Sequence, residues 1–306
     1  MQPVVDDSHL VVVVTGPTAS GKTSLAVALA EHFATDIISA DSRQIYKDIP
    51  IGTAAPSVEE CSRAFHHLVG VFDLDEYYSA ARFEEDALAL LPKIWEKSPV
   101  AVVCGGSMMY VDALCKGIDD MPTVSDSVRQ YVLSLLDAHG LDGVLAQLQI
   151  VDPDYYDVVD RANTRRVVHA VEVSLEAGCP YSSLRTGESR KRPFKILKFA
   201  IDRPREDLFA RINARVDAMI EAGLEEEARR AFAKGNFNSL NTVGYKEMAA
   251  YFVGEMNRET AIARIGKNTR VYAKKQLTWL KRDHDINWLA PDTAYSDALR
   301  IIEKSK

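Results

Sequence analysis

The stretch VVVVTGPTASGKTS, residues 11–24, constrains the fold more than any other part of the chain. Its opening run of β-branched residues is typical of a strand that is buried on both faces of a parallel sheet. The next residues match the pattern G-x-x-x-x-G-K-[ST], whose fixed positions are Gly16, Gly21, Lys22 and Thr23. Because the pattern follows a predicted strand and opens a predicted helix, it predicts a phosphate-binding loop.

Each kind of residue in this loop has a physical reason to be there. The glycines let backbone N–H groups close around an anion, and the start of the helix adds its dipole. Lys22 supplies a positive charge, and the Thr23 hydroxyl is a candidate ligand for Mg²⁺. We therefore expect phosphates to bind Gly16, Pro17, Thr18, Ala19, Ser20, Gly21, Lys22 and Thr23. The loop alone does not identify the reaction.

Short apolar segments alternate with helical ones along much of the chain. The later strand-like segments are residues 36–40, 100–104, 195–201 and 286–289. This alternation predicts an α/β fold with a doubly wound parallel sheet of the P-loop NTPase-like type. An amphipathic helix is expected at 80–97, broken near Pro92. Three helices are expected after Ile201, at 205–222, 224–233 and 258–281.

The alternation stops after Pro122, where strand signals vanish and helical periodicity takes over. We interpret residues 123–189 as a helical insertion domain, and residues 1–122 and 190–306 as the core that it interrupts. The basic stretch GESRKRP, residues 187–193, would then be the segment that returns to the core.

A carboxylate beside the loop would explain more of its chemistry. Proteins that hydrolyse ATP usually bring an acid at the end of an apolar strand, but segment 100–104 ends in Gly-Gly-Ser. The acid is instead Asp41, directly after segment 36–40, and the carboxyl ends of parallel strands line the ligand crevice. Asp41 could accept a proton from a substrate, and Gln44 could read a base edge. The alternative is that this segment is only a turn or a helix cap.

The charge is unevenly distributed. The formal net charge of −7 argues mildly against a nucleic-acid partner. Residues 261–282 nevertheless contain seven Lys or Arg and no acid. Four of these share one stripe of a helix: Lys267, Arg270, Lys274 and Lys281. The stripe could contact the phosphates of a polyanion, or it could be a solvated face. A second basic cluster comprises Arg185, Arg190, Lys191, Arg192 and Lys195.

The sequence also predicts where the protein acts. No apolar run reaches the ~18–20 residues that a membrane span needs, and the first residues lack the features of a signal peptide. The four cysteines include no CxxC pair, which is typical of reduced, buried thiols and not of a metal site. We therefore expect a cytoplasmic protein without a membrane partner, and nothing in the sequence demands more than a monomer.

Motifs along nearly the whole chain resemble those of the bacterial tRNA dimethylallyltransferase (tRNA isopentenyltransferase) family. The most specific are DSRQIYK (41–47) followed by IGTAAPS (51–57), and TRVYAKKQLTWLKRD (269–283). The others are GPTASGKT (16–23), FHHL (65–68), YSAARF (78–83), GGSMMY (105–110), NTRRVVHAVEV (163–173), RINARVDAMIEAGLEEE (211–227) and VGYKEM (243–248). Two positions depart from the family pattern, Ala55 where Lys is frequent and Leu74 where Pro is common.

The resemblance implies a reaction and its catalytic residues. In this family the loop holds the diphosphate of dimethylallyl diphosphate, and the N6 amine of the adenosine 3′-adjacent to the anticodon attacks the allylic carbon. Diphosphate then leaves, and Mg²⁺ and cationic groups stabilise its charge. The resemblance assigns catalytic roles to Asp41, as the general base, and to Ser107 and Arg215.

The resemblance also implies how the tRNA anticodon stem-loop is bound. Contacts are expected at Asp41, Ser42, Arg43, Gln44, Ser107, Arg129, Asn163, Thr164, Arg165, Arg166 and Val167, and the basic stripe adds Lys267, Arg270 and Lys274. Structural alternatives are a helix cap at Ser107, a solvated face at Arg129 and a salt bridge at Arg215. Arg165 and Arg166 could instead pair with Asp160 or Glu172.

Three other functions remain open from the sequence. A P-loop small-molecule kinase would use ATP, with basic residues 185–195 imitating its lid. An adenylate isopentenyltransferase would take free AMP or ADP, but it would not need the helical insertion. A non-enzymatic RNA-binding module would leave the phosphate loop and Asp41 without a purpose.

Overall fold

A computed structural model of the chain describes residues 9–187 and 189–305. The chain divides into two compact units. The first, the core unit, contains the residues up to Cys115 and those from Lys191 onward, and the second, the helical unit, is Lys116–Arg190. In the described ranges, no helix is both long and apolar enough to cross a membrane.

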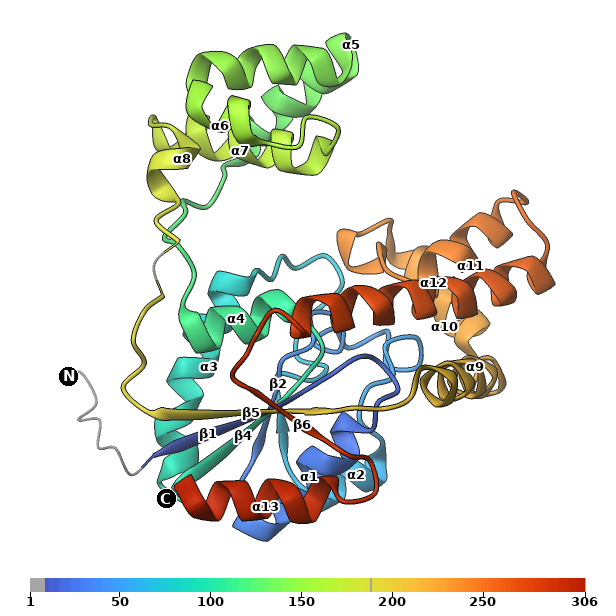
Figure 1. Cartoon of the computed structure of the whole chain (residues 1–306). Helices are drawn as coiled ribbons and strands as arrows, with labels where there is room; N and C mark the ends of the chain where they lie inside the picture. The colour runs from blue at the N-terminus through green and yellow to red at the C-terminus, as the bar shows by residue number, and fades with distance from the viewer. Residues whose placement is uncertain (1–8, 188, 306) are drawn as a thin grey trace. The chain divides into compact units, whose positions relative to one another are not determined.

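The core unit is built on one six-stranded sheet in which every pairing is parallel (Figure 1). The strand order is β3-β2-β4-β1-β5-β6. The strands are β1 (Leu10–Thr15), β2 (Ile37–Ser39), β3 (His66–His67), β4 (Val100–Cys104), β5 (Lys195–Ile201) and β6 (Ile286–Leu289). All residues of β1 and β4 are buried, as their continuous apolar runs predict. The predicted α/β fold with a parallel sheet is confirmed.

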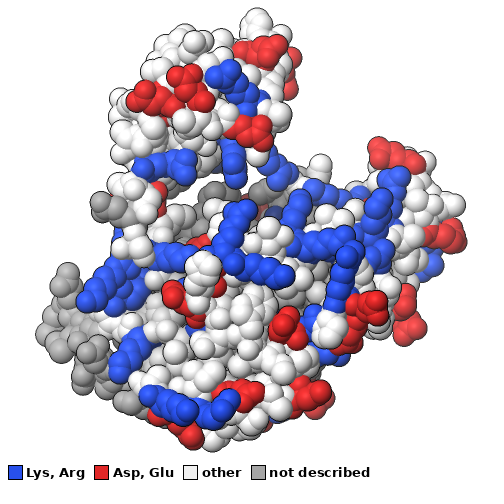
Figure 2. Space-filling view, in the orientation of Figure 1, with Lys and Arg blue, Asp and Glu red and all other residues white. Residues whose placement is uncertain are grey.

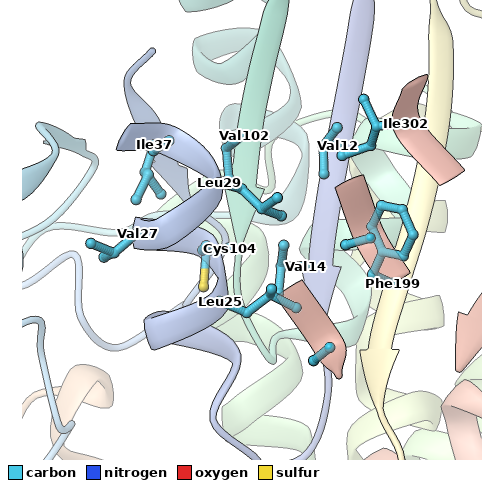
Figure 3. Close-up of a cluster of buried hydrophobic side chains, with 14 of the residues drawn as sticks. Val12, Val14, Leu25, Val27, Leu29, Ile37, Val102, Cys104, Phe199 and Ile302 are labelled. Atoms are coloured by element: carbon cyan, nitrogen blue, oxygen red, sulfur yellow. The ribbon is translucent and has the colours of Figure 1, made fainter. Parts of the chain in front are cut away.

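Helices cover both faces of this sheet. In Figure 1, α1 (Lys22–Phe33), α2 (Val58–Arg63) and α13 (Ala294–Ser305) lie below the sheet, and α4 (Met108–Lys116) and α12 (Arg258–Leu280) lie above it. Figure 3 shows Leu25 and Leu29 of α1 packed toward the buried valines of β1 and β4. The remaining helices of this unit are α3 (Ala80–Trp95), α9 (Arg205–Glu221), α10 (Leu224–Lys234), the 3₁₀ turn η1 (Asn238–Leu240) and α11 (Tyr245–Phe252).

The structure differs from the sequence-based expectation in several elements. The expected break near Pro92 is wrong, because α3 continues through this residue to Trp95. Pro92 lies in the last turn, where buried Leu91 and Ile94 hold the helix against the core and offset the lost hydrogen bond. Sequence reasoning also missed β3, α11 and α13.

The carboxyl ends of three neighbouring strands position the candidate site. Val14 of β1 and Ser39 of β2 both pair with Cys104 of β4. The Gly105 N–H donates to the Val14 carbonyl at 3.2 Å, and the Ser107 N–H donates to the Ala40 carbonyl at 3.2 Å. A Cβ on Gly105 would lie 2.1 Å from that Ala40 carbonyl oxygen, so this approach requires glycine.

The helical unit has a hydrophobic cluster of its own. Its helices are α5 (Asp126–Val151), α6 (Pro153–Val158), α7 (Thr164–Ala177) and α8 (Tyr181–Leu184). Val132, Val144 and Leu148 of α5 pack with Val167 and Val171 of α7. Residues 123–189, the helical segment expected from the sequence, fall inside this unit, with Glu188 outside the described residues.

One arginine of the second basic cluster is buried within the core unit. Arg192 donates to the Glu84 carboxylate at 2.6 Å and to the carbonyls of Ala113 and Leu114 at 2.6 and 2.7 Å. The side chains of Arg192 and Glu84 are only 8% and 6% exposed. Arg192 therefore ties the start of β5 to α3 and α4.

Replacing Glu84 by alanine is expected to destabilise the core unit strongly. The Arg192 charge would stay buried without its partner, which costs about 3–5 kcal/mol of unfolding free energy. The matched control is Glu85→Ala on the exposed side of the same helix, expected to change stability by less than about 0.5 kcal/mol. Urea denaturation of both variants measures the difference. Equal stabilities would show that the buried ion pair is unimportant.

Candidate functional site

The phosphate loop joins β1 to α1 in the conformation that an anion cradle needs. Gly16 and Gly21 have positive φ values of 146° and 102°, which residues with a Cβ rarely adopt. Gly21 is the N-cap of α1, and no side chain in the described part of the chain caps this helix end. Its first N–H groups therefore lack a side-chain acceptor at the point where the helix dipole favours an anion.

Three arginines hold the loop from α9 and the segment before it. Arg203 donates to the Ser20 carbonyl at 3.1 Å, and Arg211 donates to the Ala19 carbonyl at 2.9 Å. Arg215 donates to the Thr18 hydroxyl at 3.2 Å. Burial lowers the pKa of Arg215, and the neighbouring Arg211 lowers it further. Arg215, to which the resemblance assigns a catalytic role, thus contacts the phosphate loop itself.

A pocket opens beside the loop and is strongly cationic. Its lining is Ala19, Gly21, Lys22, Thr23, Ser24, Ala54, Ala55, Glu60, Arg211 and Arg215. Burial lowers the pKa of Lys22, and Arg215 lowers it further, whereas Cys104 and Asp41 raise it. Three cationic side chains close together, partly removed from water, favour an anionic ligand, which would raise the pKa of Lys22 again.

Asp41 follows β2 with one carboxylate oxygen engaged. Its Oδ1 accepts from the backbone N–H groups of Arg43 at 2.9 Å and Gln44 at 3.3 Å, which is the turn that the sequence analysis kept as an alternative. Among the described residues, Oδ2 has no hydrogen bond. Partial burial and the Asp41 charge raise the pKa of Tyr272 to about 12, so this tyrosine of α12, which is only partly exposed, lies within electrostatic reach of the carboxylate.

Ser107 connects the ends of β4 and β2 through its hydroxyl. The hydroxyl accepts from the Ser42 N–H at 2.8 Å and donates to the Ser42 hydroxyl at 3.1 Å. The bonded partner is therefore the residue after Asp41, and not an N–H of the helix that Ser107 precedes. This arrangement places a hydroxyl beside the candidate base.

The side chains of Gln44 and Arg43 make contacts within the protein. The Gln44 amide nitrogen donates to the carbonyls of Thr53 and Ala54 at 3.2 and 2.9 Å. Arg43 donates to the carbonyls of Asn238 and Ser239, both at 3.1 Å. In this structure Gln44 holds the segment that lines the pocket, and reading a base edge would require it to leave these partners.

Gln276 of α12 is a site residue that sequence reasoning missed. Its side chain is 2% exposed. The amide oxygen accepts from the Thr18 N–H at 2.9 Å, and the amide nitrogen donates to the Gly106 carbonyl at 2.8 Å. Gln276 falls at the helical spacing of the buried residues Ala273 and Leu280. A polar residue among apolar ones at this spacing is the pattern from which the sequence could have predicted it.

A second missed group supports the segment that follows Ile49. Glu227 accepts from the N–H groups of Ile51 and Gly52, both at 2.8 Å, and from the buried Tyr245 hydroxyl. A Cβ on Gly52 would lie 2.4 Å from that hydroxyl oxygen. The Glu227 carboxylate thus fixes the backbone of Ile51 and Gly52, next to the pocket-lining residue Ala54.

The candidate RNA-binding residues of the helical unit lie on and near α7. Asn163 caps this helix by accepting from the Arg166 N–H at 3.3 Å, and Arg165 and Arg166 are exposed. Val167 is fully buried in the hydrophobic cluster of this unit, so its side chain packs inside. Burial raises the pKa of Glu172, and the charge of Arg129 lowers it. This effect indicates that Arg129 of α5 lies close to Glu172 of α7.

The basic stripe runs along α12 in the core unit. Lys267 and Lys274 are exposed, whereas Arg270 is half-buried and donates to Asn213 of α9. Figure 2 shows blue side chains gathered along the part of the surface where Figure 1 draws α12. Exposed Tyr272 and Trp279 lie on the same helix, and aromatic rings among basic side chains suit single-stranded RNA.

Comparisons with known proteins agree with the motifs. The sequence model of the family described as IPP transferase matches residues 44–283. A protein of Parabacteroides distasonis named tRNA dimethylallyltransferase 2 is 51% identical over 281 residues, which cover 92% of this chain and 94% of that protein.

Two solved structures are similar in fold. The tRNA isopentenylpyrophosphate transferase of Bacillus halodurans has a TM-score of 0.71 at 31% identity, covering 97% of this chain and 96% of that one. A eukaryotic dimethylallyltransferase acting on tRNA has a TM-score of 0.82 at 26% identity, covering 97% of this chain and 79% of that one. As its motifs predict, the chain belongs to the IPP transferase family, together with the tRNA dimethylallyltransferases.

Proposed function

We propose that this protein transfers the dimethylallyl group of dimethylallyl diphosphate to the N6 amine of the adenosine 3′-adjacent to the anticodon in tRNA, releasing diphosphate. The observation that carries the proposal is the meeting of three strand ends. The phosphate loop follows β1, Gly105 to Ser107 follow β4, and Asp41 follows β2, all at one edge of the sheet. Donor and acceptor groups thereby have sites on adjacent loops of one chain, which fits a monomer, and a tRNA substrate fits a protein that acts in the cytoplasm.

The donor diphosphate fits the cationic pocket. Lys22, Arg211 and Arg215 line it with the phosphate loop. As the allylic C–O bond breaks, negative charge grows on the leaving diphosphate. Positive groups that are already in place stabilise this charge without reorganising, and the mostly buried cradle keeps their fields strong.

A magnesium ion fits the donor groups of the same pocket. Thr23 lines the pocket, and a hydroxyl is the hard oxygen ligand that Mg²⁺ prefers. Within the described residues, no three His, Cys, Asp or Glu side chains form a metal cage, so substrate oxygens and water would complete the coordination. Mg²⁺ would supply charge neutralisation for the leaving diphosphate.

The acceptor amine is activated by removing its proton. As the new N–C bond forms, the amine nitrogen becomes more acidic, and Asp41 Oδ2 is the oxygen that takes the proton. Oδ1 stays fixed by two backbone N–H groups. Ser107 steadies this loop through Ser42, so the carboxylate is oriented before the substrate arrives.

The RNA has two candidate binding surfaces. We assign the anticodon stem-loop to residues Arg129 and Asn163 to Val167 of the helical unit, with the basic stripe of α12 contacting phosphates. The exposed arginines of α7 and lysines of α12 suit phosphate contacts. Val167 is fully buried, so it supports this surface from within the hydrophobic cluster of the helical unit.

A mass measurement on RNA tests the proposal. An unmodified anticodon stem-loop with adenosines at the modification site and its two 5′ neighbours is incubated with dimethylallyl diphosphate, Mg²⁺ and the protein. A gain of one isopentenyl unit on one adenosine, without ATP, is the expected result. No gain, together with ATP consumption and phosphorylation of a small acceptor, would instead establish a kinase.

Asp41→Asn should slow the chemical step by ~10²- to 10⁴-fold, because the amide keeps the turn but cannot take a proton. Single-turnover kinetics measure this step, and the RNA should still bind. Asp48→Asn, which changes a surface carboxylate paired with Lys234, is the control and should react normally. Normal chemistry in Asp41→Asn would remove Asp41 from the mechanism.

Gln276→Leu should lower kcat by roughly 10- to 100-fold, because the phosphate loop and the Ser107 loop lose the side chain that holds both in place. The donor KM should rise while the RNA Kd changes less than about twofold. Thr278→Ala on the same helix is the control. A lower melting temperature with normal kinetics would mean that Gln276 only packs.

Reversing the charge of Lys267 and Lys274 together to Glu should weaken RNA binding and flatten its salt dependence. Losing two phosphate contacts lowers the slope of log K against log salt by about 1–2. A double variant with the same charge change, Lys93→Glu with Lys304→Glu, serves as the control on α3 and α13. If both double variants bind RNA alike, the stripe is a solvated face.

A further inference from the structure

One carboxylate lines the pocket whose other charged groups are cationic. Glu60 shares this wall with Lys22, Thr23, Arg211 and Arg215. It is the third residue of α2, where it completes a capping box: its N–H donates to Ser57 Oγ at 3.1 Å, and its Oε2 accepts from the Ser57 N–H at 2.9 Å. Within the described residues, Oε1 has no hydrogen bond.

Helix capping alone does not require this charge. A neutral glutamine at the third helical position closes the same box. The Glu60 charge also acts across the pocket, because it raises the pKa of Arg215 against the larger lowering effects of burial and Arg211. A carboxylate in this position therefore weakens the positive field that would hold a diphosphate.

A cation between Glu60 and the diphosphate would reverse that effect. A free carboxylate facing a diphosphate repels it, but both can bind one divalent ion. Thr23 lines the same pocket, and the nearby wall residues Ala54 and Ala55 supply no positive charge of their own. One carboxylate with substrate oxygens and water is the arrangement that Mg²⁺ commonly takes at phosphates.

We propose that Glu60 is a metal-binding residue of the donor pocket, and that it makes diphosphate binding depend on a divalent cation held with Thr23. The carboxylate binds the ion directly or through one of its waters. Without the ion Glu60 repels the diphosphate, and with the ion it attracts the complex. The inference rests on the proposed function, since it takes the ligand of this pocket to be a diphosphate.

The test is the binding of inorganic diphosphate, measured by calorimetry with EDTA and again with Mg²⁺, to the wild type, Glu60→Gln and Glu59→Gln. Glu60→Gln keeps the capping box, so its melting temperature should match the wild type. Glu59 lies on the first turn of α2 but does not line the pocket, so Glu59→Gln should bind as the wild type does.

We expect Glu60→Gln to change the diphosphate affinity in opposite directions with and without Mg²⁺. In EDTA, Glu60→Gln should bind diphosphate several-fold more tightly than the wild type, because a repulsive charge is gone. With Mg²⁺ it should bind about tenfold more weakly, and Mn²⁺ titrated in the presence of diphosphate should show the same loss by electron paramagnetic resonance.

Other outcomes would overturn the inference. Unchanged affinities in both media would assign Glu60 to helix capping alone. Weaker binding in both media would mean that it shapes the pocket without a metal. These measurements use neither RNA nor a prenyl donor, so failure of the RNA mass measurement with a positive result here would refute the reaction and leave the metal residue standing.

Discussion

The close approach of Gly105 to the Ala40 carbonyl is the constraint on which the site depends. It lets the end of β4 run against the end of β2 while the Gly105 N–H bonds to the end of β1. Three loops that are distant in the sequence therefore share one edge of the sheet, as ligand-binding loops of open parallel sheets do. A larger residue would push Ser107 and Asp41 away from the phosphate loop.

The second half of the core unit completes the phosphate loop. Arg203, Arg211 and Arg215 hold its carbonyl and hydroxyl groups from one side, and Gln276 holds Thr18 from α12. Burial disfavours the charged forms of Lys22 and Arg215, so the fold holds these positive charges at an electrostatic cost. An anionic ligand would offset this electrostatic cost. Functional sites commonly carry such a cost, because their charges are arranged for the ligand and not for the stability of the fold.

The sequence predicted the elements that local chemistry determines. The phosphate loop, its flanking strand and helix, and the other long strands follow from glycines and apolar periodicity. The two-residue strand β3 carries no such signal, and burial of Leu91 and Ile94 overrides the tendency of Pro92 to end a helix. Partners across long distances were also beyond reach: the sequence showed Arg192 as one of a basic cluster and Gln44 as a candidate for a base edge, but it did not show that they bond to Glu84 and to the Thr53 carbonyl.

The most direct test of the account is the affinity of the phosphate loop for its two candidate ligands. Calorimetry with Mg²⁺ would compare dimethylallyl diphosphate with ATP, for the wild type and for Lys22→Met. The account predicts tighter binding of dimethylallyl diphosphate, no consumption of ATP, and a loss of at least about tenfold in Lys22→Met. Tighter binding of ATP, with its γ-phosphate transferred or hydrolysed, would contradict it.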